Sequence, residues 1–330
     1  MLPPIVIDGP DPAAYTRHLL HNQTRDWAET NCYVDLLIEV LAQRGEDPRA
    51  ALGFTVAQDF EGDQFTFFKF PAADIATLYG VEILELAIYD RLEDHLRTQI
   101  GRGRLPLVEV DSFYLPDTRG VSYRATHGKT TIGVNRLDSD NRRLDYFHNS
   151  GYFRLEAEDF DALLRPSEAG GLPLFPYVEF LKFGKARPAF EQVEIARGLL
   201  ERHLARRPPQ NPFRAWGETL ERNVARLASE PVEWFHRYAF NTLRQAGANF
   251  ELLASHMAWL QQHGDGGLER SKLAAQSISQ NAKLMQFQLA RAAVRKKSPS
   301  FAEAIDQMAA DYDTVLGGLQ NRFAVTGAAA

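Results

Sequence analysis

The sequence predicts an α+β protein in which an antiparallel sheet is followed by an all-helical region. Apolar residues with helical spacing follow residue 32, and residues 105–155 then alternate with period two between turn clusters. Beyond about residue 185 only helical periodicity remains. Helices followed by consecutive strands are typical of the α+β class. The segment Gly170-Gly171-Leu172-Pro173 separates the two parts, so we expect domains at 1–170 and 171–330.

Composition narrows the class of protein. Of the 330 residues, 45% are hydrophobic and 24% charged, which is ordinary for a globular protein. The net charge of −6 argues against non-specific nucleic-acid binding. No apolar run is long enough for a membrane span, and the N-terminus lacks a signal peptide, so we expect a cytoplasmic protein that binds no membrane. A single cysteine excludes an internal disulfide and a cysteine-based metal site, and we expect no metal.

The first half of the chain is expected to begin with helices. Residues 1–15 are rich in Pro and Asp and predict a loop or arm. The elements expected next are a helix within 16–44, a short element at 51–56, an aromatic strand around 65–68 whose rings belong to the core, and one or two helices within 72–100.

Strands and then helices complete the expected order. The strands of the meander are expected at 105–115, 130–134, 143–148 and 152–155. Six helices are expected to form an antiparallel bundle, at 188–206, 212–228, 231–246, 248–262, 268–296 and 300–322.

Cys32, the only cysteine, is a candidate nucleophile. Thr30 and Asn31 precede it, and both residue types can cap a helix. Apolar Val34 and Leu37 begin the helical pattern that follows, so Cys32 is expected at a helix N-terminus. The helix dipole and backbone N–H groups favour a thiolate there. A buried cysteine that acts as a small apolar residue is the alternative.

A thiol nucleophile needs a base, and the base needs an orienting group. His127 lies just before one predicted strand, and His148 with Asn149 ends the next. Papain-like folds place Cys, His and Asn or Asp in this order, which gives Cys32, His127 and Asn149. Asp138 and Asp145 are alternative orienting groups, and His148 is an alternative base, although strand alternation directs it away from Asn149. The other histidines are expected to be solvated or capping, namely His18, His21, His95, His203, His236, His256 and His263.

The sequence offers several candidate donors for an oxyanion hole. Papain-like enzymes place a Gln about six residues before the cysteine, where it donates a hydrogen bond to the oxyanion. This chain has Asp26 there, and an ionised Asp only accepts. Gln23, Asn22 and Asn31 are alternatives, each acting with the backbone N–H of Cys32.

Several motifs of residues 25–165 together resemble an uncharacterised bacterial family, domain-of-unknown-function family 1839. They are the stretches 31–35 and 59–64, Asp111 to Asp117, His127-Gly128-Lys129-Thr130-Thr131, and Tyr146 to Tyr152. That family is associated with amino acid:carrier protein ligases and small carrier proteins. The layout is also distantly similar to the butirosin-biosynthesis acyltransferases. This second resemblance implies a papain-like core, a helical second part, and acyl transfer from a carrier protein to an amine.

The resulting hypothesis is a cysteine-dependent acyl- or aminoacyltransferase. Cys32 would take the acyl group from the phosphopantetheine thioester of a carrier protein and pass it to a small amine, with no cofactor of its own. A cysteine peptidase or amidohydrolase, and a non-catalytic carrier-protein-binding protein, are the alternatives. Association with a second copy of the chain stays open.

The distribution of charge suggests where an acidic carrier protein would dock. Residues 1–165 hold 17 Lys and Arg against 27 Asp and Glu, a net charge of −10, which leaves +4 for the rest of the chain. The basic residues of the second half cluster at Arg202, Arg206 and Arg207, and at Arg291, Arg295, Lys296 and Lys297. Solvated helix faces without a partner are the alternative reading of both clusters.

Overall fold

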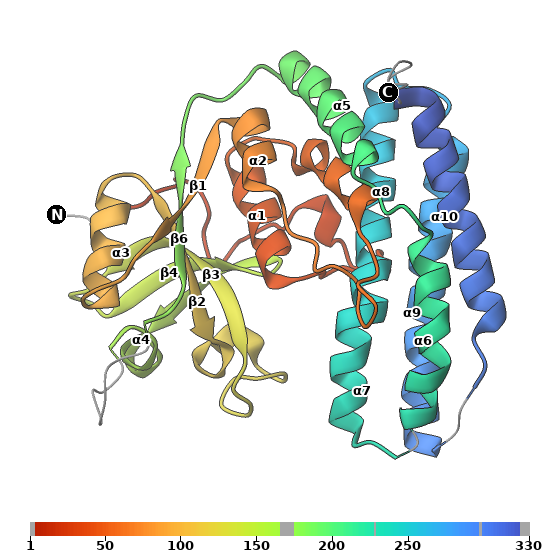
Figure 1. The fold of residues 1–330 in the computed structure, drawn as a ribbon. Helices are drawn as coiled ribbons and strands as arrows, with labels where there is room; N and C mark the ends of the chain where they lie inside the picture. Colours follow the sequence, from red (N-terminus) through yellow and green to blue (C-terminus); the bar gives the residue numbers. More distant parts are fainter. Residues whose placement is uncertain (1–3, 166–174, 228, 297–298, 324–330) are drawn as a thin grey trace. The chain divides into compact units, whose positions relative to one another are not determined.

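An antiparallel sheet of six strands forms the centre of the first half of the chain (Figure 1). The computed structural model describes residues 4–165, 175–227, 229–296 and 299–323. The sheet order is β1-β6-β2-β3-β4-β5, and all neighbouring strands are antiparallel. Its strands are β1 (Val81–Leu86), β2 (Leu105–Asp111), β3 (Lys129–Asp138), β4 (Arg143–His148), β5 (Gly151–Glu156) and β6 (Val178–Phe183). The predicted α+β class with an antiparallel sheet is confirmed.

The strands β2 to β5 are the predicted meander. They follow one another both in the chain and in the sheet. Short turns join β3 to β4 and β4 to β5, whereas the longer segment 112–128 joins β2 to β3. β4 has the predicted bounds, and β3 continues to Asp138, beyond the predicted strand. The strand expected at 105–115 ends earlier, at Asp111, because Ser112–Tyr114 form a 3₁₀ turn.

Two strands of the sheet were not predicted. The expected helices of 72–100 exist as α2 (Ala72–Tyr79) and α3 (Leu92–Gly101), but β1 lies between them. β1 is an edge strand that buries Val81 fully and carries two glutamates, so its pattern does not alternate cleanly. β6 follows the Gly- and Pro-containing segment that we took as a domain boundary, and it inserts between β1 and β2.

The aromatic strand expected around 65–68 is wrong, and its assignment to the core holds for Phe65 and Phe68 but not for Phe67, which is exposed. Phe60 and Phe65 pair only through an isolated bridge. The ring of Phe65 is buried and lies 5.7 Å from that of Phe213 and 5.3 Å from that of Trp216, between centroids. The short element expected at 51–56 is a 3₁₀ segment, Pro48–Ala57.

Helices cover both faces of the sheet. Helix α1 (Cys32–Gln43) lies on one face, and α3 and α4 (Ala157–Leu164) lie on the other (Figure 1). On the face that α1 covers, Leu36 packs closely against Gly133. A Cβ at this position would lie only 2.8 Å from Leu36 Cδ1. On the opposite face the core joins strand residues to the two helices, and its members include Val108, Ile132, Tyr146, Leu96 and Phe160.

Beyond β6 the described chain is helical, as predicted. The helices there are α5 (Ala189–Ala205), α6 (Pro212–Leu227), α7 (Val232–Ala239), α8 (Gln245–Gln262), α9 (Glu269–Arg295) and α10 (Ala302–Phe323). Figure 1 shows α6, α8, α9 and α10 side by side. A π turn over Phe240–Arg244 joins α7 to α8, where we expected a break near residue 247. None of the helices in the described ranges is long and apolar enough to cross a membrane.

The chain divides into two compact units whose boundary differs from the predicted 170/171. The first unit comprises Met1–Asn22, Asn31–Pro48 and Ile75–Arg187, because β6 belongs to the sheet. The second comprises Gln23–Thr30, Arg49–Asp74 and Pro188–Ala330. Two segments of the expected first domain therefore belong to the helical unit.

Candidate functional site

Cys32 is the first residue of α1, and Asn31 caps that helix. Asn31 has extended backbone angles (φ −143°, ψ 154°), and its side-chain oxygen accepts the N–H of Val34 at 2.9 Å. The predicted position of Cys32 at a helix N-terminus is therefore confirmed. Cys32 is neither fully buried nor fully exposed as a residue. The N–H groups and dipole of a helix N-terminus stabilise an anion at this place.

Contacts along α1 fix its direction over the sheet. Near its start, the hydroxyl of Tyr33 donates to Glu179 Oε2 at 2.7 Å, at the beginning of β6. Directly after its end, the guanidinium carbon of Arg44 lies 4.0 Å from the ring centroid of Phe183, at the end of β6. α1 therefore runs in the direction of β6. β3 runs the same way, since β3 and β6 are both antiparallel to β2.

This direction brings the start of α1 toward the start of β3. Leu36 lies against Gly133 in β3, and Cys32 precedes Leu36 by one turn on the same helix face. One helical turn rises about 5.4 Å, close to the length of two strand residues, so Cys32 is near the level of Thr131. His127 lies shortly before Lys129, the first residue of the same strand. In the described part of the chain, no hydrogen bond joins Cys32 to His127.

His127 lies in the loop before β3 and is oriented by Asp111. Its Nδ1 is 2.6 Å from Asp111 Oδ2, and its ring stacks on Phe113 with centroids 4.4 Å apart. An ionised carboxylate can only accept, so Nδ1 donates, and Nε2 of the neutral ring is the acceptor. Such an Nε2 can take a proton from a thiol and return it later. The imidazole is 70% exposed, so its proton-accepting side is open to a reacting group.

Asp111 is itself held in place at the end of β2. Its Oδ1 accepts the backbone N–H of Phe113 at 3.0 Å and that of Gly128 at 3.1 Å. Burial alone would raise the pKa of Asp111, but the hydrogen bonds from His127, Phe113 and Gly128 outweigh burial and lower this pKa. The carboxylate therefore stays ionised and keeps the imidazole in one tautomer.

Asn149, the predicted orienting group, does not contact His127. It lies in the turn between β4 and β5 with a φ of +46°, a left-handed conformation that Asn tolerates well. Among the described residues no hydrogen bond connects Asn149 to the imidazole, and Asp111 takes that position. The alternatives Asp138 and Asp145 are also engaged elsewhere: Asp138 accepts from Asn141, and Asp145 pairs with Arg154. Sequence reasoning missed Asp111 because the strand pairing that brings it beside His127 is not a local property of the sequence.

His148, the alternative base, lies on the other face of the sheet from α1. His148 and Tyr146 are two residues apart in β4, so their side chains lie on the same face of the sheet. Tyr146 belongs to the core under α3 and α4. The Nδ1 of His148 is 2.6 Å from Asp117 Oδ2, and its Nε2 is 2.8 Å from Thr130 Oγ1. The side chain is buried, so this network stabilises the core and does not serve Cys32.

The oxyanion candidates fall into different parts of the chain. The side-chain oxygen of Asn31 is used as the cap of α1. Gln23, exposed, and Asp26, partly exposed, belong to the second unit together with Thr24, while Asn22 ends a segment of the first. The backbone N–H of Asp26 donates to Glu251 Oε1 at 3.0 Å. Donation by Gln23 or Asn31 to an oxyanion stays a prediction.

Two family models match the chain and together cover nearly all of it. The DUF1839 N-terminal domain matches residues 16–183, and the DUF1839 C-terminal domain matches residues 189–321. The chain belongs to the DUF1839 family. No curated protein matches it. Cys32, Asp111 and His127 all lie within the match to the N-terminal domain of the family.

The DUF1839 protein has a second histidine site that the sequence did not reveal. His21 was expected to be solvated, but it is fully buried, with Nδ1 hydrogen-bonded to Glu39 and Nε2 3.2 Å from Asp35 Oδ1. Burial lowers the pKa of His21, but hydrogen bonds to Asp35 and Glu39 and the charges of both outweigh burial and raise the pKa to about 9. His203 and His256, also expected to be exposed or capping, are buried too. Within the described residues no group of three or more His, Cys, Asp or Glu could hold a metal ion.

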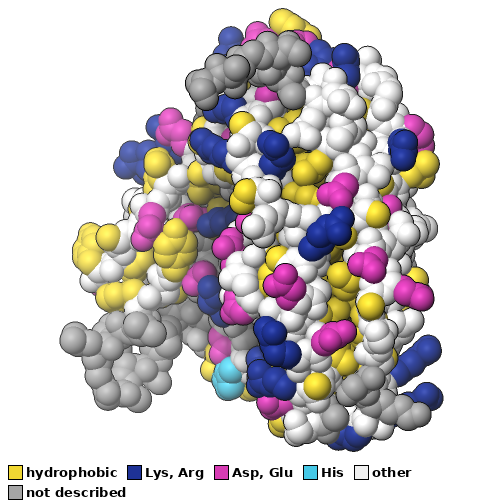
Figure 2. Space-filling view, turned by 45° about the vertical axis from the view of Figure 1, so that its right-hand side comes forward, with side chains coloured by type: hydrophobic (Ala, Val, Ile, Leu, Met, Phe, Trp, Pro, Cys, Tyr) yellow, Lys and Arg dark blue, Asp and Glu magenta, His cyan; other side chains and the backbone are white. Residues whose placement is uncertain are grey.

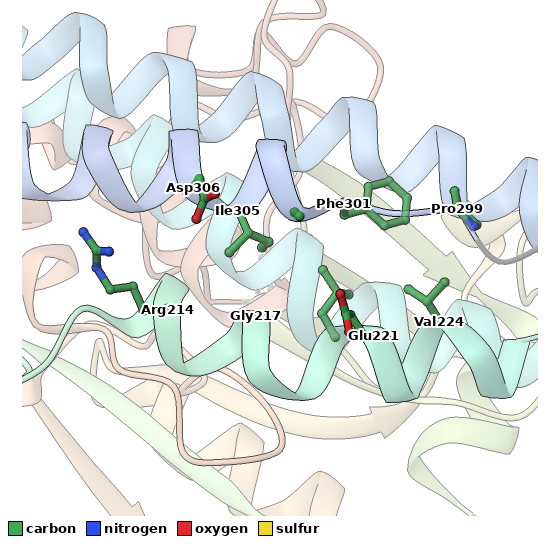
Figure 3. A pocket seen from close by; sticks show the side chains of 10 residues that line it. Arg214, Gly217, Glu221, Val224, Pro299, Phe301, Ile305 and Asp306 are labelled. Atoms are coloured by element: carbon green, nitrogen blue, oxygen red, sulfur yellow. The ribbon is translucent and has the colours of Figure 1, made fainter.

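The helical unit of the DUF1839 protein contains a cavity of about 350 Å³ between α6 and α10 (Figure 3). Its floor is apolar, with Ile305 against Gly217 and Phe301 opposite Val224. Its lining also includes charged residues, among them Arg214, which pairs with Asp313 on α10. Among the described residues, the lining holds no cysteine, serine or histidine that could act as nucleophile or imidazole base in acyl transfer.

Proposed function

We propose that this DUF1839 protein is a cysteine-dependent acyl- or aminoacyltransferase with Cys32 as nucleophile and His127 as base. The observation that carries the proposal is the pairing of a capped helix start at Cys32 with an imidazole oriented by Asp111. The direction of α1 aims the start of this helix at the end of β3 that His127 precedes. A cysteine helix packed on an antiparallel sheet, with the histidine at a strand start, is the papain-like layout.

The reaction has two steps in this proposal. Cys32 Sγ attacks the thioester carbonyl of an acylated carrier protein, a new C–S bond forms, and the phosphopantetheine thiol leaves with the proton that His127 held. An amine then attacks the Cys32 thioester, an amide bond forms and the C–S bond to Cys32 breaks. His127 accepts the proton of the amine and returns it to the sulfur of Cys32. Because thioester exchange is nearly balanced in energy, the first step needs mainly an activated thiol and a stabilised oxyanion.

The proposed partner is an acidic carrier protein in the cytoplasm, attracted by basic residues of the helical unit. Arg202, Arg206 and Arg207 are exposed at the end of α5, and Arg291, Arg295 and Lys296 at the end of α9. Lys297, the last member of the second cluster, lies outside the described residues. Figure 2 shows Lys and Arg interspersed with Asp and Glu on one face, so local clusters and not a uniform field would steer the partner.

Intact-mass spectrometry tests the proposed function. The protein is mixed with an aminoacylated carrier protein, with and without a small primary amine. The proposal predicts a mass increase equal to the acyl group on the wild type and none on Cys32→Ala. It also predicts that the amine discharges the adduct to an amide.

The alternatives give different results in this experiment. Discharge by water alone, with no amide product, indicates a hydrolase of the peptidase or amidohydrolase type. Carrier-protein binding without any adduct indicates a non-catalytic binding protein and contradicts the proposal.

A further inference from the structure

A second cavity lies wholly within the helical unit and is lined by polar groups. Its volume is about 350 Å³, at the small end of the range of small-molecule sites. The segment 24–26 and helices α8 and α9 form it, and the lining residues are Thr24, Arg25, Asp26, Glu251, Ala254, Ser255, Ala258, Gln276, Ser279 and Gln280. None of these residues belongs to the unit that contains Cys32.

Most of the charged groups of this cavity are engaged with each other. Glu251 accepts the backbone N–H of Asp26 at 3.0 Å and of Trp27 at 2.9 Å, and Arg25 Nη2 lies 3.5 Å from its Oε2. Arg25 Nη1 also donates to Ser255 Oγ at 3.1 Å. Arg25 and Glu251 therefore neutralise each other, and Ser255 is used within the same network.

The hydroxyl of Ser279 and the carboxylate of Asp26 are lining groups to which the described chain gives no hydrogen bond. The hydroxyl of Ser279 is fully buried and makes no hydrogen bond. The carboxylate of Asp26 makes neither a hydrogen bond nor an ion pair with any described residue. A buried hydroxyl without a partner is costly, and most such groups in folded proteins are hydrogen-bonded. Because Arg25 faces Glu251, the charge of Asp26 makes the lining net negative, and the Ser279 hydroxyl has no hydrogen-bond partner among the described residues.

Lys283 is the nearby cation that could have neutralised Asp26. Its Nζ instead lies 4.2 Å from the ring centroid of Trp27, and no ion pair joins it to Asp26 in the described residues. Burial and the charge of Arg244 lower the pKa of Lys283, which the charges of Asp26 and Glu251 only partly offset. Lys283 therefore leaves the carboxylate of Asp26 available to a cation that enters the cavity.

We propose that this cavity binds a small primary amine in its ammonium form. The ammonium would donate to the carboxylate of Asp26, and the hydroxyl of Ser279 would hydrogen-bond to the same ligand. Charge-assisted hydrogen bonds of this kind are the stronger ones in proteins. The cavity size limits the ligand to a small metabolite, and the site does not depend on the chemistry proposed for Cys32.

Isothermal titration of the full chain with three probes of similar size tests the site. Propylamine carries an ammonium, propanol is neutral and propionate is an anion. The proposal predicts saturable binding of propylamine alone. Asp26→Asn should weaken it by about tenfold or more, because the ligand loses a charge-assisted hydrogen bond. Asp306→Asn, in the lining of the cavity between α6 and α10, should bind propylamine as the wild type does.

A second variant separates binding from structure. Ser279→Ala removes a buried hydroxyl that has no partner, so it should leave the melting temperature unchanged or higher, yet weaken propylamine binding. Equal binding of all three probes, no saturable binding of propylamine, or full binding by Asp26→Asn would overturn the proposal. Loss of binding in a Ser279→Ala protein that is also destabilised would assign Ser279 a purely structural role and contradict its part in the site.

Discussion

Two histidines of the first unit differ in the number of carboxylates that they face. The histidine with one carboxylate can act as a base, whereas the histidine with two is a cation that stabilises the fold. His127 has one carboxylate, on Nδ1, and its other nitrogen is the acceptor. His21 faces a carboxylate on each nitrogen, Glu39 on one side and Asp35 on the other. A ring with acceptors at both nitrogens is stable only as the imidazolium, so His21 cannot accept a proton from a thiol.

His21 should make the stability of the first unit depend on pH. Its pKa is raised from the ordinary 6.5 to about 9, so below pH 6.5 it is protonated in both the folded and unfolded chain and its contribution is complete. Above 6.5 the unfolded chain loses the proton first, and the contribution declines until pH exceeds about 9. The expected loss of unfolding free energy is about 3 kcal/mol, from ~1.4 kcal/mol for each unit of pKa shift.

Urea unfolding at about pH 6 and about pH 9.5 measures this effect. His21→Gln should be less stable at the lower pH and show a flatter dependence on pH. His236→Gln, at an exposed position on α7, is the matched control and should follow the wild type. An equally steep decline in His21→Gln and wild type would contradict the assignment.

At the scale of elements, α1 is the part that sets the site, because it carries Cys32 and its packing fixes where Cys32 lies. Leu36 packs at Gly133, where the strand has no side chain. The cap at Asn31 fixes where α1 begins, so Cys32 lies one helical turn before Leu36. Only one helical turn separates this contact from Cys32, so a substitution at Gly133 should change the position of Cys32.

Gly133→Val should displace α1 from the sheet. A Cβ at this position would lie 2.8 Å from Leu36 Cδ1 and 3.1 Å from Leu105 Cδ2, both in a buried environment. The expected loss of stability is about 1–3 kcal/mol, the usual cost of overpacking a core. Thermal unfolding measures the loss, and the alkylation rate of Cys32 should fall with it.

Gly101→Ala, at the end of α3, is the matched control. Nothing lies within 4 Å of a Cβ at this position, so its melting temperature and alkylation rate should stay close to those of the wild type. A Gly133→Val protein as stable and as reactive as Gly101→Ala would show that the contact with Leu36 does not position α1.

The elements also show which features the sequence can predict. Strands β2 to β5 and the start of α1 were predictable, because alternation, turn residues and the cap at Asn31 are local signals. β1 was not, because an edge strand with two glutamates lacks a clean alternation. Asp111 was missed for a different reason: the pairing of Asp111 with Lys129 across two strands brings it beside His127, and such register is not a local property.

At the scale of the whole molecule, the charge imbalance between the two halves bears on the partner. The net charge of −10 over residues 1–165 would repel an acidic carrier protein, whereas the net +4 of the remainder would attract it. Arg202 of the first basic cluster forms an ion pair with Asp74, with Nη2 4.0 Å from Oδ1. Arg291 and Arg295 of the second cluster are exposed, so that cluster is the better candidate for steering.

Reversing Arg295, Lys296 and Lys297 to Glu should raise the apparent KM for the carrier protein several-fold at low salt. Steering acts on the association rate and fades as salt screens it, so the difference should shrink at high salt. Turnover of a small thioester mimic should be unchanged. Reversing Arg202, Arg206 and Arg207 is the comparison, and a salt-independent KM in the wild type would remove the basic half from the docking model.

The rate of Cys32 alkylation by iodoacetamide near neutral pH measures the activation of the proposed nucleophile, because the chain has only this cysteine. The account predicts that the wild type reacts much faster than a free thiol and that His127→Ala is slower by roughly tenfold. Asp111→Asn should slow the reaction in the same direction but less, and Asn149→Ala should react like the wild type. A His127→Ala protein that is folded and alkylates at the wild-type rate would contradict the account.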